Sequence, residues 1–247
     1  RTYRLALAAT GEYTVAAGGT QVLALSRMTA TINRINGIFE RDLSVMLELR
    51  TGTAGDPTAL IYTNPGGDPY TNGDALLMLD ENQANIDTVI GSSNYDVGHV
   101  FASAGGGYAT VGSPCDAGLK AQGVTGSTNP TGDAFDIDYV AHELGHQFGG
   151  NHTFNSTSNG CTGSRAFRRA YEVGSGSTIM SYAGICDPED LQLHSNDHFH
   201  VGSLDEITAF LTSGGGSTCG TTAATGNALP TVSGGSNYTI PQQTPFA

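Results

Sequence analysis

The sequence has little positive charge. Ten lysine and arginine residues stand against 23 aspartate and glutamate residues, the formal net charge is −13, and Lys120 is the single lysine. A surface of this kind repels the phosphate backbone of nucleic acids. We therefore expect no nucleic-acid partner.

Long apolar runs are also absent from the sequence. No stretch reaches the roughly 18 apolar residues of a membrane-spanning helix, so we expect no membrane attachment. No leader with a charged part and then an apolar part precedes Arg1. This start predicts a secreted, extracellular protein from which a signal peptide and an inhibitory pro-segment have been removed. We expect it to act as a monomer.

The four cysteines include no C-x-x-C pair. Cys115, Cys161, Cys186 and Cys219 form an even set, which indicates disulfide bonds made in an oxidising compartment. The alternative, four reduced thiols in a cytosolic protein, agrees less well with the acidic, glycine-rich and lysine-poor composition. Three pairings are possible from the sequence alone.

Periodic apolar patterns predict the secondary structure. The chain of 247 residues is long enough for one large or two modest domains. The patterns predict strands at 3–9, 43–49, 96–101, 108–112 and 122–125, and helices at 20–38, 74–90, 135–148 and 203–211. Because strands alternate with helices, we expect an α/β (α+β) fold with a mixed five-stranded sheet, flanking helices, and helix 135–148 packed behind the sheet.

Helix 135–148 carries a metal-binding pattern. From His142 to His152 the sequence reads H-E-x-x-H-x-x-G-x-x-H. His142 and His146 lie one turn apart on the same helix face, so both imidazoles can reach one ion. Gly149 can adopt a positive φ, end the helix and bring His152 to the same ion. Three imidazole ligands leave the fourth tetrahedral position of a zinc ion to water, as in a catalytic zinc site.

Glu143 lies beside the first of these ligands. Its carboxylate is expected to reach the metal-bound water and to act as the general base. An H-E-x-x-H alone also occurs in exposed helices as solvated polar residues, whereas the full pattern is far rarer by chance. A further alternative is a non-catalytic, zinc-stabilised binding module, although a structural zinc normally takes four protein ligands.

A second motif follows the first along the chain. Residues 177–182 read Ser-Thr-Ile-Met-Ser-Tyr. With the histidine pattern, this segment resembles the Met-turn of the metzincin zinc metalloproteases, in which the methionine packs beneath the three imidazoles. In astacins and serralysins, a tyrosine two residues after that methionine can touch the zinc and stabilise the oxyanion. The resemblance implies these roles for Met180 and Tyr182; otherwise Tyr182 is a buried side chain with a satisfied hydroxyl.

The resemblance extends over residues 3 to 210. The element order and the segments 36–43 and 107–115 are similar to the adamalysin or reprolysin group of metzincins. This group implies a metzincin fold with a twisted sheet, the zinc helix at the cleft and a small irregular C-terminal subdomain that ends in a helix. Thr153 and Phe154 are more like the pappalysin group, and adamalysins lack the tyrosine of Met-x-Tyr. We therefore expect a reprolysin-like, secreted bacterial metzincin.

The domain organisation and the disulfide pairing follow from composition and from the same resemblance. We expect a catalytic domain at 1–212 (upper subdomain about 1–150, lower subdomain about 151–212), a Gly/Ser/Thr-rich linker at 213–229, and at 230–247 a tail or the start of a further β-domain. By resemblance to reprolysins, the disulfide bonds join Cys115 to Cys219 and Cys161 to Cys186.

Other histidines and carboxylates carry weaker signals. His194, His198 and His200 could hold a second zinc, but surface or capping roles near the last helix explain them better. His99 lies on a predicted strand and is expected to pack or hydrogen-bond. Two acidic groups, Asp133, Asp136 and Asp138 and then Asp187, Glu189 and Asp190, lack the spacing of a calcium loop, and helix capping explains the first. Calcium therefore remains only an expectation from family and composition.

The sequence as a whole predicts a zinc-dependent endopeptidase that hydrolyses peptide bonds of extracellular proteins. The metal ligands are His142, His146 and His152, and the catalytic residues are Glu143 and Tyr182. A polypeptide substrate is expected to pair as an added edge strand with residues 108–111. The alternative enzymes are pappalysin-like or serralysin-like proteases of narrow specificity. The side-chain preference depends on the loop after Met180 and is not readable from the sequence.

Overall fold

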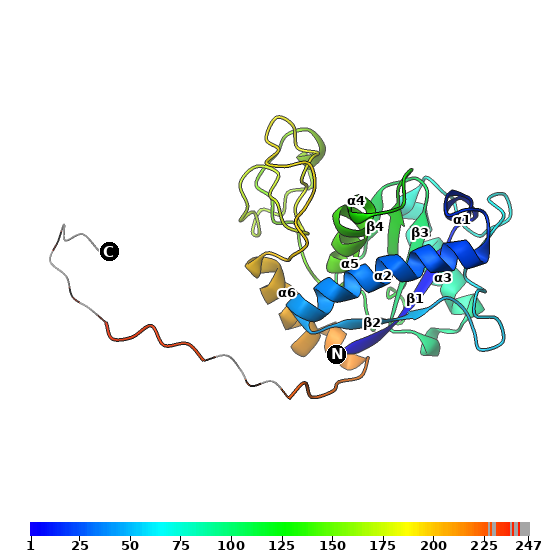
Figure 1. The fold of residues 1–247 in the computed structure, drawn as a ribbon, viewed down its shortest axis with the longest axis horizontal. Coiled ribbons are helices and arrows are strands. Elements are labelled where there is room, and N and C mark those ends of the chain that lie inside the picture. Colours follow the sequence, from blue (N-terminus) through cyan, green and yellow to red (C-terminus); the bar gives the residue numbers. More distant parts are fainter. Residues whose placement is uncertain (227, 229–230, 238, 240–241, 243–247) are drawn as a thin grey trace.

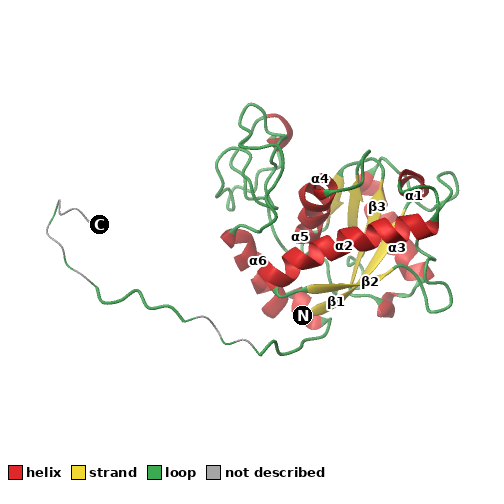
Figure 2. Cartoon of the chain, in the orientation of Figure 1, coloured by secondary structure: helices red, strands yellow, loops and turns green. Residues whose placement is uncertain are grey.

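A five-stranded sheet forms the centre of the computed structural model, which describes residues 1–226, 228, 231–237, 239 and 242 (Figures 1 and 2). The strands are β1 Thr2–Ala9, β2 Met46–Arg50, β3 Val97–Ala102, β4 Gly107–Ala109 and β5 Gly123–Gly126. They lie in the order β2-β1-β3-β5-β4. Neighbouring strands are parallel except for β4, which pairs antiparallel with β5 at one edge. The expected mixed sheet is confirmed.

Helices cover both faces of this sheet. They are α1 Gly11–Ala16, α2 Gln21–Leu43, α3 Ala75–Val89, α4 Asp133–Phe135, α5 His142–Gln147 and α6 Val201–Thr212. The π-helical segment Asp136–Ala141 joins α4 to α5, so the predicted helix 135–148 is one helical stretch with a wider middle turn. Residues 151–200 are mostly loops, and α6 follows them, as expected for the small irregular subdomain (Figure 2).

Several elements differ from the prediction, among them the strand expected at 108–112, which spans only Gly107–Ala109. The strand expected from residue 43 begins at Met46, because α2 continues to Leu43 and Ser44 ends it in the left-handed conformation (φ 55°, ψ 36°). The short helix α1 was not predicted. The Thr10 side chain caps it by accepting from the Tyr13 backbone N–H, at 3.1 Å, so a threonine just before the glycine was the available signal.

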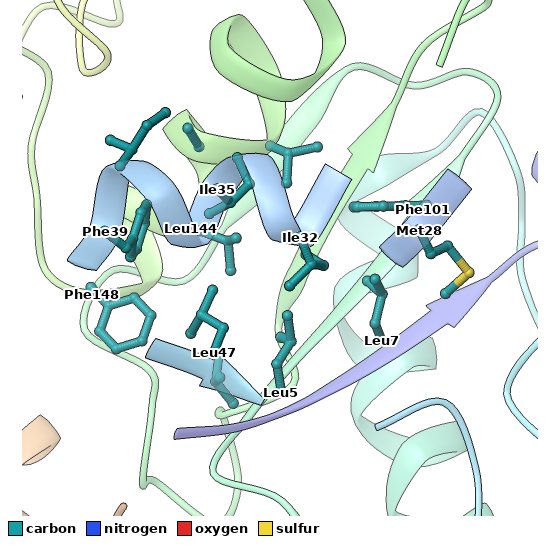
Figure 3. Close-up of a cluster of buried hydrophobic side chains, with 14 of the residues drawn as sticks. Leu5, Leu7, Met28, Ile32, Ile35, Phe39, Leu47, Phe101, Leu144 and Phe148 are labelled. Atoms are coloured by element: carbon teal, nitrogen blue, oxygen red, sulfur yellow. The ribbon is translucent and has the colours of Figure 1, made fainter. Parts of the chain in front are cut away.

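Successive side chains of β1 point to opposite faces of the sheet, and the hydrophobic core is accordingly divided into two clusters. Leu5 and Leu7 point to one face and pack with the apolar side of α2 and with Leu144 of α5 (Figure 3). Ala6 and Ala8 point to the other face and pack with α3. Burial of α5 against the sheet fixes the helix that carries the predicted metal ligands, because a close-packed core resists shifts of its elements.

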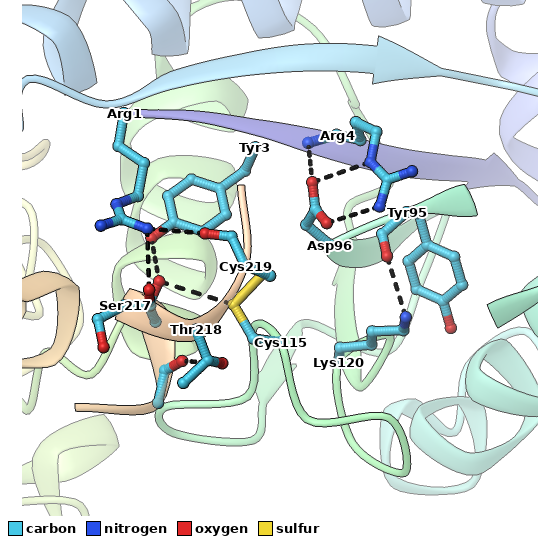
Figure 4. The surroundings of a disulfide bond; sticks show 12 residues. Arg1, Tyr3, Arg4, Tyr95, Asp96, Cys115, Lys120, Ser217, Thr218 and Cys219 are labelled. Carbon is cyan, nitrogen blue, oxygen red and sulfur yellow. Dashed lines mark hydrogen bonds and ion pairs between the residues drawn. A yellow bond between two sulfur atoms is a disulfide. The ribbon is translucent and has the colours of Figure 1, made fainter. Parts of the chain in front are cut away.

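Two disulfide bonds tie the chain together. They join Cys115 to Cys219 and Cys161 to Cys186, so the pairing implied by the family resemblance is confirmed. Near the first bond, Arg1 Nη1 donates to the Cys219 carbonyl at 2.8 Å (Figure 4). The backbones of Thr2 and Thr221 also exchange hydrogen bonds of 2.8 and 2.9 Å. The segment expected as a linker from residue 213 is therefore attached to the body up to Thr221.

Removal of the Cys115–Cys219 bond is expected to lower the free energy of unfolding by about 4.7 kcal/mol, because it closes a long loop, 104 residues by sequence separation. Urea denaturation of a protein with both cysteines replaced by serine measures the loss. The matched control removes Cys161–Cys186, which spans 25 residues and should cost about 3.5 kcal/mol. A larger loss for the shorter loop would contradict this loop-entropy explanation.

The C-terminal segment leaves the sheet after Thr221. Its described residues from 222 onward are exposed. Most of the segment 230–247, expected as a tail or as the start of a further β-domain, lies outside the described residues. Among the residues that the structure describes, no helix combines the length and the apolar composition needed to cross a membrane.

Candidate metal centre

Three imidazole nitrogens converge beside the sheet. The Nε2 atoms of His142 and His146 are 3.1 Å apart, those of His142 and His152 are 3.2 Å apart, and those of His146 and His152 are 2.9 Å apart. Across the described ranges, these three histidines are the only group of three or more histidine, cysteine or acidic side chains close enough to hold one metal ion. The structure thus brings together the three residues that the sequence pattern singled out.

The hydrogen bond of Nδ1 in each ring determines which of the two ring nitrogens carries the proton. Nδ1 of His142 lies 2.7 Å from the Ile179 carbonyl oxygen, and that of His146 lies 2.8 Å from the Gly150 carbonyl oxygen. His152 Nδ1 lies 2.6 Å from the carbonyl oxygen of Ser164. A carbonyl only accepts, so each Nδ1 carries the proton and each neutral ring presents a lone pair at Nε2.

Three lone pairs that face one another fit a cation. They cannot satisfy one another, because none of the Nε2 atoms has a hydrogen to donate. Two ligand atoms about 2.0–2.1 Å from one tetrahedral zinc are about 3.3 Å apart, close to the spacing found here. Burial lowers the pKa of all three histidines, that of His146 to about 3, which keeps the rings neutral as metal ligands must be. The donor set therefore fits the zinc ion that the sequence predicts.

The backbone after α5 delivers the third histidine. Gly149 has a φ of 97°, the left-handed region expected for the residue that ends this helix. The Gly149 and Gly150 N–H groups donate back to the carbonyls of His146 and Gly145. The chain then leaves the helix axis and places His152 opposite the first two ligands, as the glycine in the pattern predicts.

The Met-turn lies directly against the zinc helix. Met180 is fully buried, and a methyl group built on Gly145 would lie 2.4 Å from its sulfur. Only glycine at position 145 allows this approach, because a side chain there would displace the methionine. The Thr153 N–H donates to the Met180 carbonyl at 3.0 Å, so the turn is also bonded to the residue after the third ligand. Met180 therefore packs at the helix of the ligands, where the resemblance placed it.

Glu143 is buried at the edge of the same cluster. Its side chain lies against β4, since a methyl group on Gly107 would come within 2.1 Å of Glu143 Oε1. Burial raises the pKa of Glu143 to about 8. A bound dication would lower that pKa again, because a nearby positive charge favours the carboxylate. The carboxylate thus lies between the helix and the edge strand β4.

Tyr182 lies beside two of the three histidines. Its ring centroid is 4.5 Å from that of His152 in an edge-on arrangement and 5.5 Å from that of His142. The ring also stacks on Phe154 at 4.6 Å. Burial raises the pKa of Tyr182, so its hydroxyl keeps its proton at neutral pH and can act as a donor.

Glu172 is a residue that the sequence did not single out. Its carboxylate accepts from the hydroxyls of Thr153 and Thr178, at 2.5 and 2.6 Å, and from the backbone N–H groups of Ser177 and Thr178, at 2.9 and 3.1 Å. Burial raises the pKa of Glu172, but these hydrogen bonds outweigh burial and hold that pKa below its usual value. Glu172 therefore fastens the start of the Met-turn to the residue that follows the third ligand.

The remaining sequence candidates have other partners. Asp133, Asp136 and Asp138 were expected to cap the helix; they lie in its first turns as expected, but none of them forms a side-chain capping hydrogen bond. Asp133 pairs with Arg34, Asp136 accepts from the Thr31 hydroxyl at 2.8 Å, and Asp138 lies 2.6 Å from His194. The three carboxylates tie the helix to α2 and to the loop at His194, and they are not gathered around one point.

The histidines near the last helix behave as expected. His200 Nδ1 caps α6 by accepting from the Gly202 N–H at 3.0 Å, and its ring stacks on Tyr171. His194 pairs with Asp138, and His198 is exposed. Within the described residues, these three histidines do not form a group that could hold an ion.

His99 is buried on β3. One of its ring nitrogens is 2.9 Å from Gln147 Oε1 and the other is 2.9 Å from the Thr125 hydroxyl, so the expected hydrogen-bonding role is confirmed. Burial lowers the pKa of His99 to about 4. Since its unfolded value is near 6.5, the unfolded state binds more protons in this window, and stability falls as the pH drops from 6.5 to about 4.

Because of His99, we expect the free energy of unfolding to fall by about 3 kcal/mol as the pH drops from 6.5 to about 4, at about 1.4 kcal/mol per pH unit. Urea denaturation in the presence of a chelator, compared between the unsubstituted protein and His99→Gln, measures this contribution. The variant should lose less stability over that window. His198→Gln is the control, because His198 is exposed to solvent in the folded state as it is in the unfolded state. The expectation would be contradicted if the free energy of unfolding fell equally steeply with pH in the unsubstituted protein and in His99→Gln.

A cleft of about 460 Å³ opens beside the metal centre. It is lined by His142, Glu143 and Tyr182, by Gly107 and Tyr108 of β4, and by residues after the Met-turn. A second cavity of about 640 Å³ lies elsewhere, at Arg4 and Arg50, and its lining has no histidine, cysteine or carboxylate. Of these two cavities, the first is the one lined by a residue of the histidine cluster.

Two histidines on one helix, a third brought in after its glycine end, the glutamate beside them and the methionine beneath them define the metzincin class of metallopeptidases. Residues 1–209 match the family described as Metallo-peptidase family M12B Reprolysin-like. The chain belongs to this reprolysin-like family.

A solved structure has a similar arrangement of the chain. The crystal structure of metalloproteinase-II from Bacteroides fragilis has 13% sequence identity and a TM-score of 0.48, over 85% of this chain and 52% of that one. The chain therefore spans about half the length of that protein. A comparison with curated protein sequences found no match.

Proposed function

We propose that the chain is a zinc endopeptidase that hydrolyses peptide bonds of extracellular proteins. The observation that carries this proposal is the convergence of three Nε2 lone pairs within 3.2 Å of one another beside a buried glutamate, at the wall of a cleft of about 460 Å³. Membership in a metallopeptidase family supports the same reaction class. The two disulfide bonds support secretion, because such bonds persist in oxidising compartments.

His142, His146 and His152 would hold the zinc. When bound, zinc supplies a Lewis acid that polarises a peptide carbonyl and lowers the pKa of a coordinated water. The protein contributes the preorganisation. The Nδ1 hydrogen bonds to backbone carbonyls fix the orientation of each ring, and Glu172 and the Met-turn hold the segment of the third ligand in place.

Glu143 is proposed as the general base. Its carboxylate takes a proton from the attacking water as the water oxygen bonds to the carbonyl carbon, and it gives that proton to the leaving nitrogen when the C–N bond breaks. The position of Glu143 against β4 supports this role, since a peptide paired with this edge strand would pass beside the carboxylate.

Tyr182→Phe is expected to lower kcat by about 10-fold to 100-fold, with little change in KM. Its protonated hydroxyl is proposed to donate to the oxyanion, and one such donor contributes up to a few kcal/mol. Steady-state kinetics on a single peptide substrate measure the effect. Tyr171→Phe is the control, because Tyr171 packs on His200 and does not line the cleft. An unchanged kcat would contradict the donor role and would mean that Tyr182 only packs against its neighbours.

Cleavage of casein tests the proposed function directly. The purified protein should cleave casein, a chelator should stop the cleavage, and added zinc should restore it. Zinc bound at one equivalent without cleavage of casein or of a peptide library would contradict the proposal. That result would favour a non-catalytic, zinc-stabilised binding module.

A further inference from the structure

The cleft extends beyond the metal centre along one side of the zinc helix. On one side lie the residues one turn before His142, Asp138 and Tyr139. On the other side lie two segments that follow the Met-turn, 183–185 and 193–195. This part of the cleft is therefore a side-chain pocket next to the reacting atoms, built from three segments.

The walls of the pocket are apolar. Tyr139, Ile185 and Leu193 all line it, and they are 38%, 46% and 77% exposed. Large apolar side chains that remain this exposed in a cleft offer surface for the stem of a long substrate side chain. A short or purely polar side chain would leave them uncovered.

The polar groups of the pocket include the carboxylate of Asp138. The Asp138 side chain is 16% exposed, its Oδ1 accepts from the Ser195 N–H at 2.8 Å, and its Oδ2 lies 2.6 Å from His194 Nδ1. Each oxygen has a further lone pair. Ser181 also lines the pocket, and its buried hydroxyl has no hydrogen-bond partner within the described part of the chain. No lysine or arginine is among the lining residues.

We infer that this pocket selects an arginine or lysine side chain at the residue that follows the scissile bond, and that Asp138 is the specificity-determining residue. The inference rests on the proposed endopeptidase function. The apolar walls suit the aliphatic stem of such a side chain, and the Asp138 carboxylate suits its cationic head. We assign the pocket to the residue after the scissile bond because Glu143, which lines the same cleft, gives its proton to the nitrogen of that residue in the proposed mechanism.

His194 is the competing partner of Asp138. Its side chain is 65% exposed, so it can turn away into solvent when a substrate cation approaches. A guanidinium or ammonium group then replaces a single hydrogen bond with a charge-assisted one, and a guanidinium can add a second. If His194 instead governed the pocket as a cation, acidic substrate side chains would be preferred, and the two cases give opposite results.

Four peptides that differ only in the residue after the scissile bond (arginine, lysine, norleucine or glutamate) test this inference. We expect kcat/KM for arginine to exceed that for norleucine by about 10-fold or more, which is the size of a hydrogen bond to a charged group. Asp138→Asn keeps the shape and the acceptor for Ser195 but removes the charge, and it should lower this ratio by about 10-fold. Asp205→Asn removes the same charge from an exposed position on α6, outside the cleft, and should leave the ratio unchanged.

Peptide binding gives a second readout that needs no turnover. Calorimetric titration of the arginine and norleucine peptides into Glu143→Gln should show the same preference, and its loss when Asp138→Asn is added. A wild-type preference for glutamate or norleucine, or an arginine preference that survives Asp138→Asn in both experiments, would overturn the inference. Cleavage of none of the peptides would overturn the proposed function instead, and the binding ratio would still decide the role of Asp138.

Discussion

Glu143→Gln is expected to lower kcat by about 10²-fold to 10⁴-fold, the range that a positioned general base contributes. Glutamine keeps the size of the buried side chain against Gly107 but cannot take a proton from the attacking water. Since Glu143 is not one of the three histidines that converge, the zinc content of the purified variant should stay near one equivalent. The combination of full zinc content and little turnover is the signature of a base and not of a ligand.

Metal analysis and steady-state kinetics on the same preparation measure both quantities. Glu189→Gln is the matched control, because the Glu189 carboxylate accepts from the Ser156 hydroxyl and lies outside the cleft. It should change neither quantity appreciably. Near-native turnover of Glu143→Gln would exclude the proposed base, and loss of zinc would make Glu143 a structural support of the metal.

The three-histidine cluster was predictable because its residues are close together in the sequence. The spacing of His142 and His146 needs only a helix, and the glycine at 149 needs only one residue at positive φ to bring in His152. The strands and long helices were also predicted, since their apolar periods match the faces that they bury. The breaks at the short helix α1 and at Ser44 were missed because short capping signals are weaker than these periods.

The rest of the site depends on contacts between distant segments. Asp138 and His194 are 56 positions apart, and Glu172 reaches Thr153 and Ser177 across loops that have no regular period. A carboxylate at a helix start fits capping by sequence alone, and only the fold shows that Asp138 faces a cleft. For the same reason, the Gly/Ser/Thr-rich composition after residue 212 predicted a linker, whereas the disulfide bond to Cys115 holds that segment on the body.

His152→Ala is expected to weaken zinc binding by more than about 100-fold, which is the upper end of the effect of losing even an outer-shell partner. The variant keeps two ligands one helix turn apart, and two imidazoles hold zinc weakly. Peptide cleavage should fall to background at zinc concentrations that saturate the unsubstituted protein. The Nδ1 bond to the Ser164 carbonyl is lost as well, so the segment after Gly149 also loses one of its attachments.

Competition with a chromogenic chelator gives the zinc affinity, and thermal unfolding with and without zinc gives an independent measure. Zinc should raise the Tm of the unsubstituted protein, because an ion bound only by the folded state stabilises it by mass action. Bound zinc should also remove the repulsion among the three Nε2 lone pairs, which face one another within 3.2 Å. The same addition should barely move the Tm of His152→Ala, while His198→Ala, an exposed histidine outside the cluster, should respond like the unsubstituted protein. An unchanged zinc affinity of His152→Ala would mean that the ion is held elsewhere, and the three-histidine centre would then have to be abandoned.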